Sequence, residues 1–127
     1  MNKVKFLTTY WQAVEQKNKS EFLTYFHEDA MIYLHDTNDE FPPEYYIREE
    51  DDFGNDWHTT VDRVEELKSG QIMTITFHRS SDWIGFVTSF FTFQDEKIIK
   101  LHEYFSPCDD NIVPQWRVDL KEEEKLK

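Results

Sequence analysis

One acidic residue, Glu103, stands in an apolar strand pattern and is the first residue of this sequence that could do chemistry. The segment Trp83–Phe105 is predicted to form two β-strands joined by a turn at Asp95 and Glu96. Alternate residues of a strand point to one face, so Glu103 shares a row with Ile99, Leu101 and Phe105. Burial there without a cation would raise the pKa of Glu103 and make it a general acid or base near neutral pH. The other interpretation is a structural acid near the sheet end, hydrogen-bonded to the backbone or paired with Arg63.

A second polar cluster, made of His35, Asp36 and Asn38, ends the strand predicted over residues 30–35. Adjacent strand residues point to opposite faces, so spacing alone does not make His35 and Asp36 a catalytic dyad. Asp36 and Asn38 also fit an Asx turn that reverses the chain. For Asn38 the turn is favoured, whereas a catalytic role stays open for His35 and Asp36.

Two basic side chains, Arg63 and His78, lie on the strands predicted over 57–67 and 71–79 and could position a ligand carboxylate or pair with Glu103. They could equally decorate the outer face of the sheet. No metal site is expected, because the five histidines lack HxH, HxxxH or HExxH spacing. The lone Cys108 stands beside two acids that disfavour its thiolate, so a nucleophilic role is not expected.

The elements that must position these residues follow in a simple order. Helical periodicity over 2–17 and a capping box at Asn18 and Glu21 predict two helices. A strand, a short helix over 43–50 and four antiparallel strands follow, the last two over 83–94 and 97–105. This order predicts an α+β fold in which a curved antiparallel sheet wraps around the N-terminal helices as a cone. Such a cone has one open mouth, near which Tyr46, Trp57 and Phe105 would lie as ligand-binding candidates.

The composition and charge of the chain exclude some classes of binding partner. The chain has 127 residues, a net charge of −12 and 17% aromatic residues, which describes one folded domain over 1–120 with a frayed charged tail over 121–127. The negative charge argues against nucleic acid and against an anionic membrane as partners. With one cysteine and neither a signal-type segment nor an 18-residue apolar run, a soluble cytoplasmic protein is expected.

Three segments resemble nuclear transport factor two-like (SnoaL-like) cone domains. The opening of these domains is similar to EFLTYFHEDAMIYLHDTNDEF, which starts at Glu21. Their closing hairpin is similar to SFFTFQDEKIIKLHEYFSP, which starts at Ser89. A small-protein subset of the superfamily also contains the sequence PQWR, found here at 114–117. The resemblance implies a cystatin-like α+β roll, or cone, over about residues 5–117, with the row of Glu103 and Leu101 facing its cavity. Further ligand-binding candidates in this cavity are Leu101, Tyr10, Leu34 and Ser89. Set against the ketosteroid isomerase branch, the positions of its two acids carry Leu34 and Ser89, and Tyr10 matches its hydroxyl donor. The usual design of that branch is therefore not expected.

The function that follows is cofactor-free acid or base chemistry (isomerisation, dehydration or cyclisation) on a small hydrophobic molecule, or non-catalytic binding of such a molecule. The discriminator between the two is whether two titratable side chains converge inside the cavity. A protein-interaction module is a more remote third possibility. A homodimer is also expected, because Ile84, Phe86 and Phe90 would leave an apolar patch on the outer face of the sheet.

Overall fold

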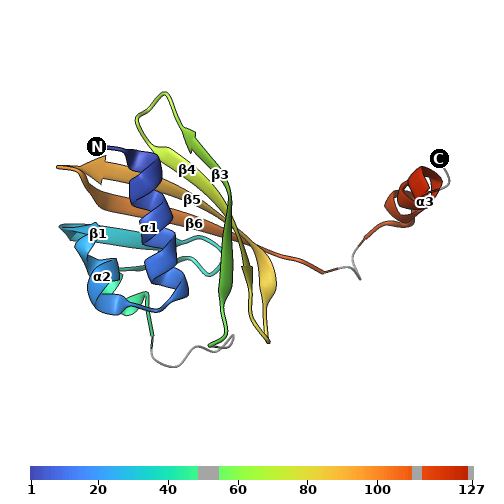
Figure 1. Cartoon of the computed structure of the whole chain (residues 1–127), viewed down its shortest axis with the longest axis horizontal. Coiled ribbons are helices and arrows are strands. Elements are labelled where there is room, and N and C mark those ends of the chain that lie inside the picture. Colours follow the sequence, from blue (N-terminus) through green and yellow to red (C-terminus); the bar gives the residue numbers. More distant parts are fainter. Residues whose placement is uncertain (49–54, 110–112, 126–127) are drawn as a thin grey trace.

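The computed structural model describes residues 1–48, 55–109 and 113–125 as ten helices and strands (Figure 1). In chain order they are α1 (Lys3–Glu15), α2 (Lys19–Thr24), β1 (Phe26–Leu34), β2 (Asp39–Phe41), the 3-10 helix η1 (Pro43–Tyr45), β3 (His58–Glu66), β4 (Ile72–Arg79), β5 (Ile84–Gln94), β6 (Lys97–Pro107) and α3 (Gln115–Lys125). None of the helices in the described part of the chain has the length and apolar character needed to cross a membrane.

The six strands form one curved sheet in the order β2-β1-β6-β5-β4-β3. The meander from β3 to β6 is antiparallel, as predicted. The β1–β6 pair is parallel, so the prediction of an entirely antiparallel sheet is wrong at this pair. After β2, which pairs with β1, the chain crosses to the far edge of the sheet and returns strand by strand, which brings β6 back alongside β1 in the same direction.

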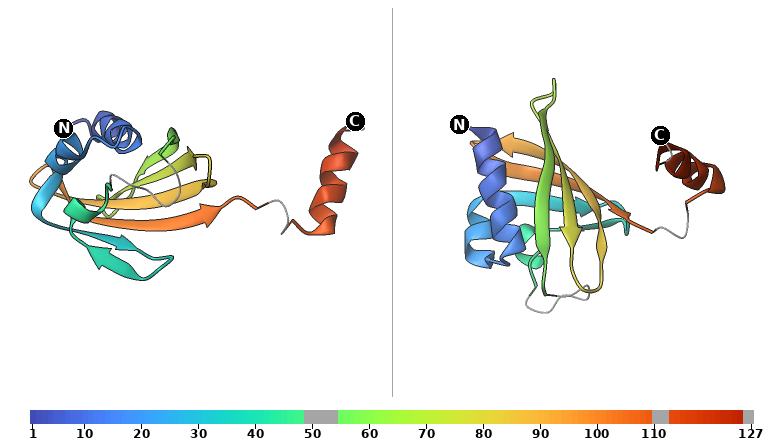
Figure 2. Two further views of the ribbon diagram at one scale, coloured as in Figure 1. Left: turned by 90° about the horizontal axis from the view of Figure 1, so that it is seen from below. Right: turned by 45° about the vertical axis from the view of Figure 1, so that its right-hand side comes forward.

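The two N-terminal helices lie on the concave side of the sheet, where α1 crosses in front of β5 and β6 and lies beside β3 (Figures 1 and 2). The side chains of Asn2 and Asn18 accept hydrogen bonds from the third residue beyond each, which satisfies a free backbone N–H at each helix start. The buried residues of α1 are Leu7, Tyr10, Trp11 and Ala13, and they pack with Phe22 of α2 against the sheet. The α+β cone predicted from the element order is therefore confirmed.

Two irregularities in the sheet decide which side chains face this core. Around Asp62 the register of β3 against β4 shifts, so that Val61 pairs with Thr76 and Arg63 pairs with Ile75. A second shift lets Ile98 pair with Phe93 and leaves Ile99 as the extra residue of β6. Ile98 is consequently fully buried in place of Ile99, which the simple alternation had put in the core row.

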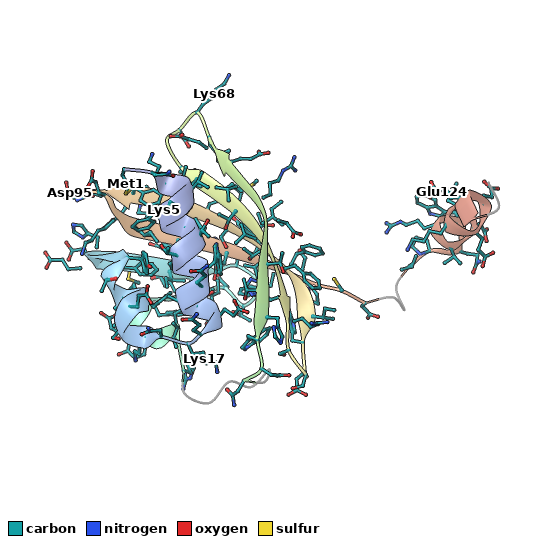
Figure 3. All side chains as sticks on the ribbon, in the orientation of Figure 1. Met1, Lys5, Lys17, Lys68, Asp95 and Glu124 are labelled. Carbon is teal, nitrogen blue, oxygen red and sulfur yellow. The ribbon has the colours of Figure 1, made fainter. Side chains whose placement is uncertain are left out.

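The remaining differences from the sequence-based prediction are local. Strand β1 begins four residues earlier than predicted, and β2 was not predicted. The short helix predicted over 43–50 is the single 3-10 turn η1, and residues 49 and 50 lie outside the described residues. Helix α3 takes in most of the segment expected to be a frayed tail. At the β5–β6 turn, Asp95 and Glu96 have φ values of 52° and 63°, as a two-residue hairpin turn requires, and Figure 3 shows Asp95 at that tip.

Candidate functional site

Glu103 lies in the middle of the concave face and is fully buried. It pairs with Ser89 on one side and Leu34 on the other, so the pleat of β6 directs its carboxyl group toward the helices. The Tyr46 hydroxyl donates a hydrogen bond of 2.6 Å to Oε1, and the Ser89 hydroxyl donates one of 2.7 Å to Oε2. Among the described residues no Lys or Arg forms an ion pair with this carboxyl group.

The surroundings of Glu103 favour its protonated form. Burial raises the pKa of Glu103 to about 7, because the anion loses its hydration. The hydrogen bonds from Tyr46 and Ser89 act in the opposite direction by stabilising the anion, while the negative charge of Asp36 raises the pKa further. A carboxyl group with a pKa near the working pH can release and take up a proton with little cost in either direction.

The hydroxyl of Tyr10 is the second feature of this site. Tyr10 is completely buried in α1, and within the described residues its hydroxyl has no hydrogen-bond partner. Burial and the nearby Glu103 raise its pKa well above the usual value, so the group is a neutral O–H donor. An unpaired buried hydroxyl costs about 1–3 kcal/mol, a penalty that a ligand oxygen placed beside it would remove.

His78 forms a separate polar cluster on the same concave face, toward the end of β4. Its Nδ1 lies 3.0 Å from the Thr59 hydroxyl and its Nε2 lies 2.7 Å from the Thr76 hydroxyl. Because Thr76 Oγ1 donates its proton to the carbonyl oxygen of Val87 at 3.3 Å, it must accept from Nε2–H, and Nδ1 then accepts from Thr59. Burial lowers the pKa of His78 to about 4, so the ring is neutral in this arrangement.

Aromatic rings surround His78 and extend to the neighbouring strand ends. Trp11 and Trp57 contact the imidazole at ring-centroid distances of 5.4 and 6.3 Å, and Trp83 lies between Trp57 and Phe105 at 6.0 and 6.3 Å. The sequence pattern indicated Trp57 and Phe105 as ligand-binding candidates, but not Trp11 or Trp83. The partners Thr59 and Thr76 could have been found, because they occupy the inward rows of their strands.

The structure brings only some of the candidate residues to Glu103. Ser89, Tyr46, Leu34 and Leu101 lie next to it on the sheet or bind it. The charge of Asp36 raises the pKa of Glu103, and the charge of Glu103 in turn raises the pKa of Tyr10. Arg63 lies apart, because the bulge at Asp62 turns its exposed side chain to the outer face, where it pairs with Glu65 at 3.0 Å.

The His35 side chain also lies away from the Glu103 carboxyl group, although the His35 backbone N–H donates a hydrogen bond of 3.0 Å to the Glu103 carbonyl oxygen. Its ring stacks on Tyr104 at 4.5 Å and its Nε2 lies 2.8 Å from Nδ1 of His102, both of which point outward from β6. Desolvation and the neighbouring His35 lower the pKa of His102. The His35 ring therefore has no contact with the buried carboxyl group, whereas the charge of Asp36 acts on that group by raising its pKa.

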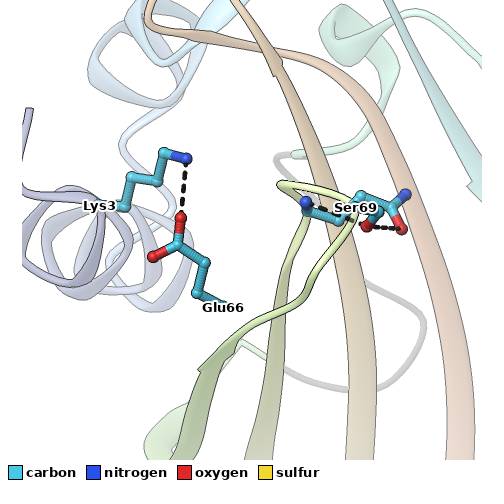
Figure 4. A network of polar contacts seen from close by, with 4 residues as sticks. Lys3, Glu66 and Ser69 are labelled. Carbon is cyan, nitrogen blue, oxygen red and sulfur yellow. Dashed lines mark hydrogen bonds and ion pairs between the residues drawn. The ribbon is translucent and has the colours of Figure 1, made fainter.

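A hollow of about 290 Å³ opens beside the start of α1, where the ammonium group of Lys3 meets the carboxylate of Glu66 at 3.4 Å (Figure 4). Its lining is Met1, Asn2, Lys3, Val4, Val64, Glu66 and Ile72, none of which is a candidate site residue. In the described part of the chain no three His, Cys, Asp or Glu side chains are grouped to hold a metal ion.

The chain is similar to known proteins in its fold. Neither protein-family models nor curated protein sequences match the chain. Among solved structures, a candidate ketosteroid isomerase from Kribbella flavida aligns with a TM-score of 0.68 at 17% identity, covering 87% of this chain and 86% of that one. An NTF2-like protein of unknown function from Burkholderia xenovorans aligns with a TM-score of 0.69 at 14% identity, covering 91% and 89%. A candidate SnoaL-like polyketide cyclase from Shewanella putrefaciens aligns with a TM-score of 0.68 at 6% identity, covering 83% and 80%.

These neighbours are NTF2-like and SnoaL-like proteins, and the chain shares their α+β cone. At such low sequence identity, a shared fold does not assign functional roles to individual residues.

Proposed function

We propose that the protein carries out cofactor-free acid or base chemistry on a small hydrophobic molecule held in a central apolar pocket against the concave face. The observation that carries this proposal is the presence of two buried polar groups on the concave side of the sheet. Glu103 is fully buried with a pKa of about 7, and the hydroxyl of Tyr10 has no hydrogen-bond partner among the described residues. Two solved structures with this fold are a candidate ketosteroid isomerase and a candidate SnoaL-like polyketide cyclase, activities that are compatible with proton-transfer chemistry.

The two groups have complementary roles. Tyr10 donates its unpaired O–H to a carbonyl or hydroxyl oxygen of the ligand, which stabilises negative charge that develops there. Glu103 exchanges a proton with a neighbouring ligand atom, because both of its protonation states are accessible near pH 7. Tyr46 and Ser89 fix the carboxyl group in place, since each oxygen already accepts one hydroxyl hydrogen bond.

The second candidate function is non-catalytic binding of the same class of molecule. One observation favours it: the hydrogen bonds from Tyr46 and Ser89 occupy both carboxyl oxygens of Glu103, as they would for a purely structural acid. In that case Tyr10 alone provides the polar contact that orients the ligand. For both candidate functions we propose a cytoplasmic location, as predicted from the sequence.

Hydrogen–deuterium exchange tests the proposal. The protein is incubated in D₂O with a panel of apolar cyclic and linear ketones, and deuterium incorporation next to the carbonyl is followed by NMR and mass spectrometry. Glu103→Gln should reduce catalysed exchange by about 10²–10⁴-fold, the usual contribution of a general acid or base. Glu28→Gln, which changes an exposed acid of β1, serves as the matched control and should leave exchange unchanged.

The outcomes separate the two functions. Tyr10→Phe should also slow exchange if its hydroxyl stabilises the developing charge. Ligand binding without exchange above the buffer rate would favour the binding protein. Equal exchange by wild type and Glu103→Gln would remove Glu103 from the chemistry altogether.

A further inference from the structure

The carboxyl group of Glu103 is enclosed, so a ligand reaches its proton only by way of a neighbouring group. Glu103 is fully buried, and each of its carboxyl oxygens already accepts a hydrogen bond, from Tyr46 at 2.6 Å and from Ser89 at 2.7 Å. Unless one of these hydrogen bonds is first broken, a proton that enters or leaves the carboxyl group must pass through one of the two hydroxyl groups.

The two hydroxyl groups differ in what lies beyond them. Ser89 is itself fully buried, and its partners across the sheet are Glu103 and Thr74, which are fully buried as well. Tyr46 is only half-buried and lies directly after η1, outside the sheet. Of these two donors, Tyr46 is therefore the one that links the carboxyl group to accessible surface.

Tyr46 is held in place at both ends of its side chain. Its ring stacks on the ring of Phe22 in α2, with the centroids 5.3 Å apart and the planes 9° from parallel. Phe22 is fully buried, so it provides a fixed surface for this stacking. At the other end, the 2.6 Å contact with Oε1 of Glu103 lies within the range that direct proton transfer requires.

The hydroxyl group of Tyr46 has the chemistry of a proton relay. A hydroxyl group has one proton to donate and two lone pairs that accept. The Tyr46 oxygen can therefore donate its proton to Glu103 while it accepts a proton from a ligand. Ser89 has the same chemistry, but it is enclosed by the sheet and the helices and has no surface for a ligand.

Building on the proposed function, we propose that Tyr46 is a further catalytic residue, which passes the proton between the ligand and Glu103. The carbon–hydrogen bond beside a ligand carbonyl breaks, its electron pair stays on the ligand, and its proton bonds to the Tyr46 oxygen. In the same step the O–H bond of Tyr46 breaks and that proton bonds to Oε1 of Glu103. Tyr46 is neutral before and after the step, and one negative charge moves from Glu103 to the ligand.

Direct contact between the ligand and Glu103 is the less favourable alternative. The ligand would have to displace the Tyr46 hydroxyl group and take its place beside a carboxyl group that has no accessible surface. In this alternative Tyr46 obstructs the ligand, so removal of its hydroxyl group would leave the reaction rate unchanged or increase it. The two paths therefore predict opposite effects of the same substitution.

Tyr46→Phe tests the relay, because it removes the hydroxyl group and keeps the ring that stacks on Phe22. Exchange into the ketone panel is compared on the high-pH plateau of each variant, where Glu103 is ionised. Tyr46→Phe should lower this rate by about 10²-fold or more, the usual contribution of a positioned acid or base. Ser89→Ala removes the other hydrogen bond to the same carboxyl group and should lower the rate far less. Tyr45→Phe, the same change at the adjacent exposed tyrosine, is the matched control and should leave it unchanged.

A solvent isotope effect tests the relay in the wild-type protein, so the test remains valid if Tyr46→Phe fails to fold. Release of tritium from a ketone labelled beside its carbonyl is measured on the same plateau in H₂O and in D₂O. In the relay, a solvent-exchangeable proton moves from Tyr46 to Glu103 as the labelled bond breaks, so release should be slower in D₂O. Direct transfer from carbon to Glu103 moves no exchangeable proton and should give equal rates.

The outcomes distinguish the relay from the proposed function on which it rests. Equal tritium release in the two solvents would overturn the relay, as would a folded Tyr46→Phe variant that exchanges as fast as wild type. If Glu103→Gln is inactive in the same experiment, the proposed function stands without the relay. A fully active Glu103→Gln variant, or a panel in which no ketone exchanges above the buffer rate, would overturn both.

Discussion

Replacing Glu103 by Gln should change how the stability of the protein depends on pH. In the folded protein the pKa of Glu103 is about 7, against an ordinary value of 4.5. Below pH 4.5 the carboxyl group is neutral in both the folded and the unfolded chain, so it adds no pH dependence. Between pH 4.5 and 7 the unfolded chain releases this proton while the folded chain keeps it, and the free energy of unfolding falls as pH rises.

The magnitude follows from the pKa difference. At about 1.4 kcal/mol per pKa unit, the loss between pH 4.5 and pH 8 is on the order of 3 kcal/mol. Gln carries no charge, so the variant lacks this loss and should gain on wild type by the same amount over the interval. In melting temperature the gain is on the order of 10 °C for a chain of this size.

Urea unfolding of wild type, Glu103→Gln and the control Glu28→Gln at half-unit steps from pH 5 to 8 measures this effect. The free-energy difference between Glu103→Gln and wild type should grow steadily with pH, whereas that of the control should stay flat. A constant difference for Glu103→Gln would refute the desolvation argument. A difference that shrinks with pH would mean that a cation stabilises the Glu103 anion.

Four further predictions concern the surroundings of the site and the sheet. Tyr46→Phe removes the 2.6 Å hydrogen bond that stabilises the anion, so the pKa of Glu103, followed by carboxyl ¹³C NMR, should rise further above 7. The ring of His78 should stay in its neutral Nε2–H form from pH 8 to 5 in ¹⁵N NMR, and an imidazolium signal at pH 6 would contradict the burial argument. Glu96→Gly should stabilise the protein to urea by about 1 kcal/mol, since Gly adopts the positive φ of this turn position without strain. Gly85→Ala should lower the melting temperature and alter Trp83 fluorescence, because an added Cβ would lie 2.7 Å from the Trp83 ring and 2.6 Å from the Ser106 carbonyl oxygen.

Alternation in the sequence predicted most of the sheet, and with it the direction of Glu103. The pattern of β6 put Glu103 in the row of Leu101, and the structure buries both. Alternation failed where a strand holds an extra residue. The bulge at Asp62 turns the Arg63 side chain to the side of the sheet away from the helices, and alternation in the sequence does not indicate a bulge.

The partners of Glu103 were only partly accessible from the sequence. Tyr46 follows a single 3-10 turn, whose position depends on tertiary packing more than on local sequence, so its hydrogen bond to Glu103 could not be inferred. Ser89 and Tyr10 came from the family resemblance. That resemblance could indicate their positions but not that the Tyr10 hydroxyl would lack a partner.

The parallel pairing of β1 with β6 sets the order in which the chain can fold. Phe26 pairs with Ile98 and Leu34 pairs with Glu103, so the two strands meet across about seventy residues of intervening chain. Closing so long a loop is entropically costly, and contacts of this range slow folding. The β3–β6 meander can form from neighbouring segments, and α1 can pack on β3, β4 and β5, but β1 gains its place beside the meander only after β6 is present. During synthesis, therefore, Glu103 cannot be enclosed between β1 and β5 until the whole of β6, as far as Pro107, has left the ribosome.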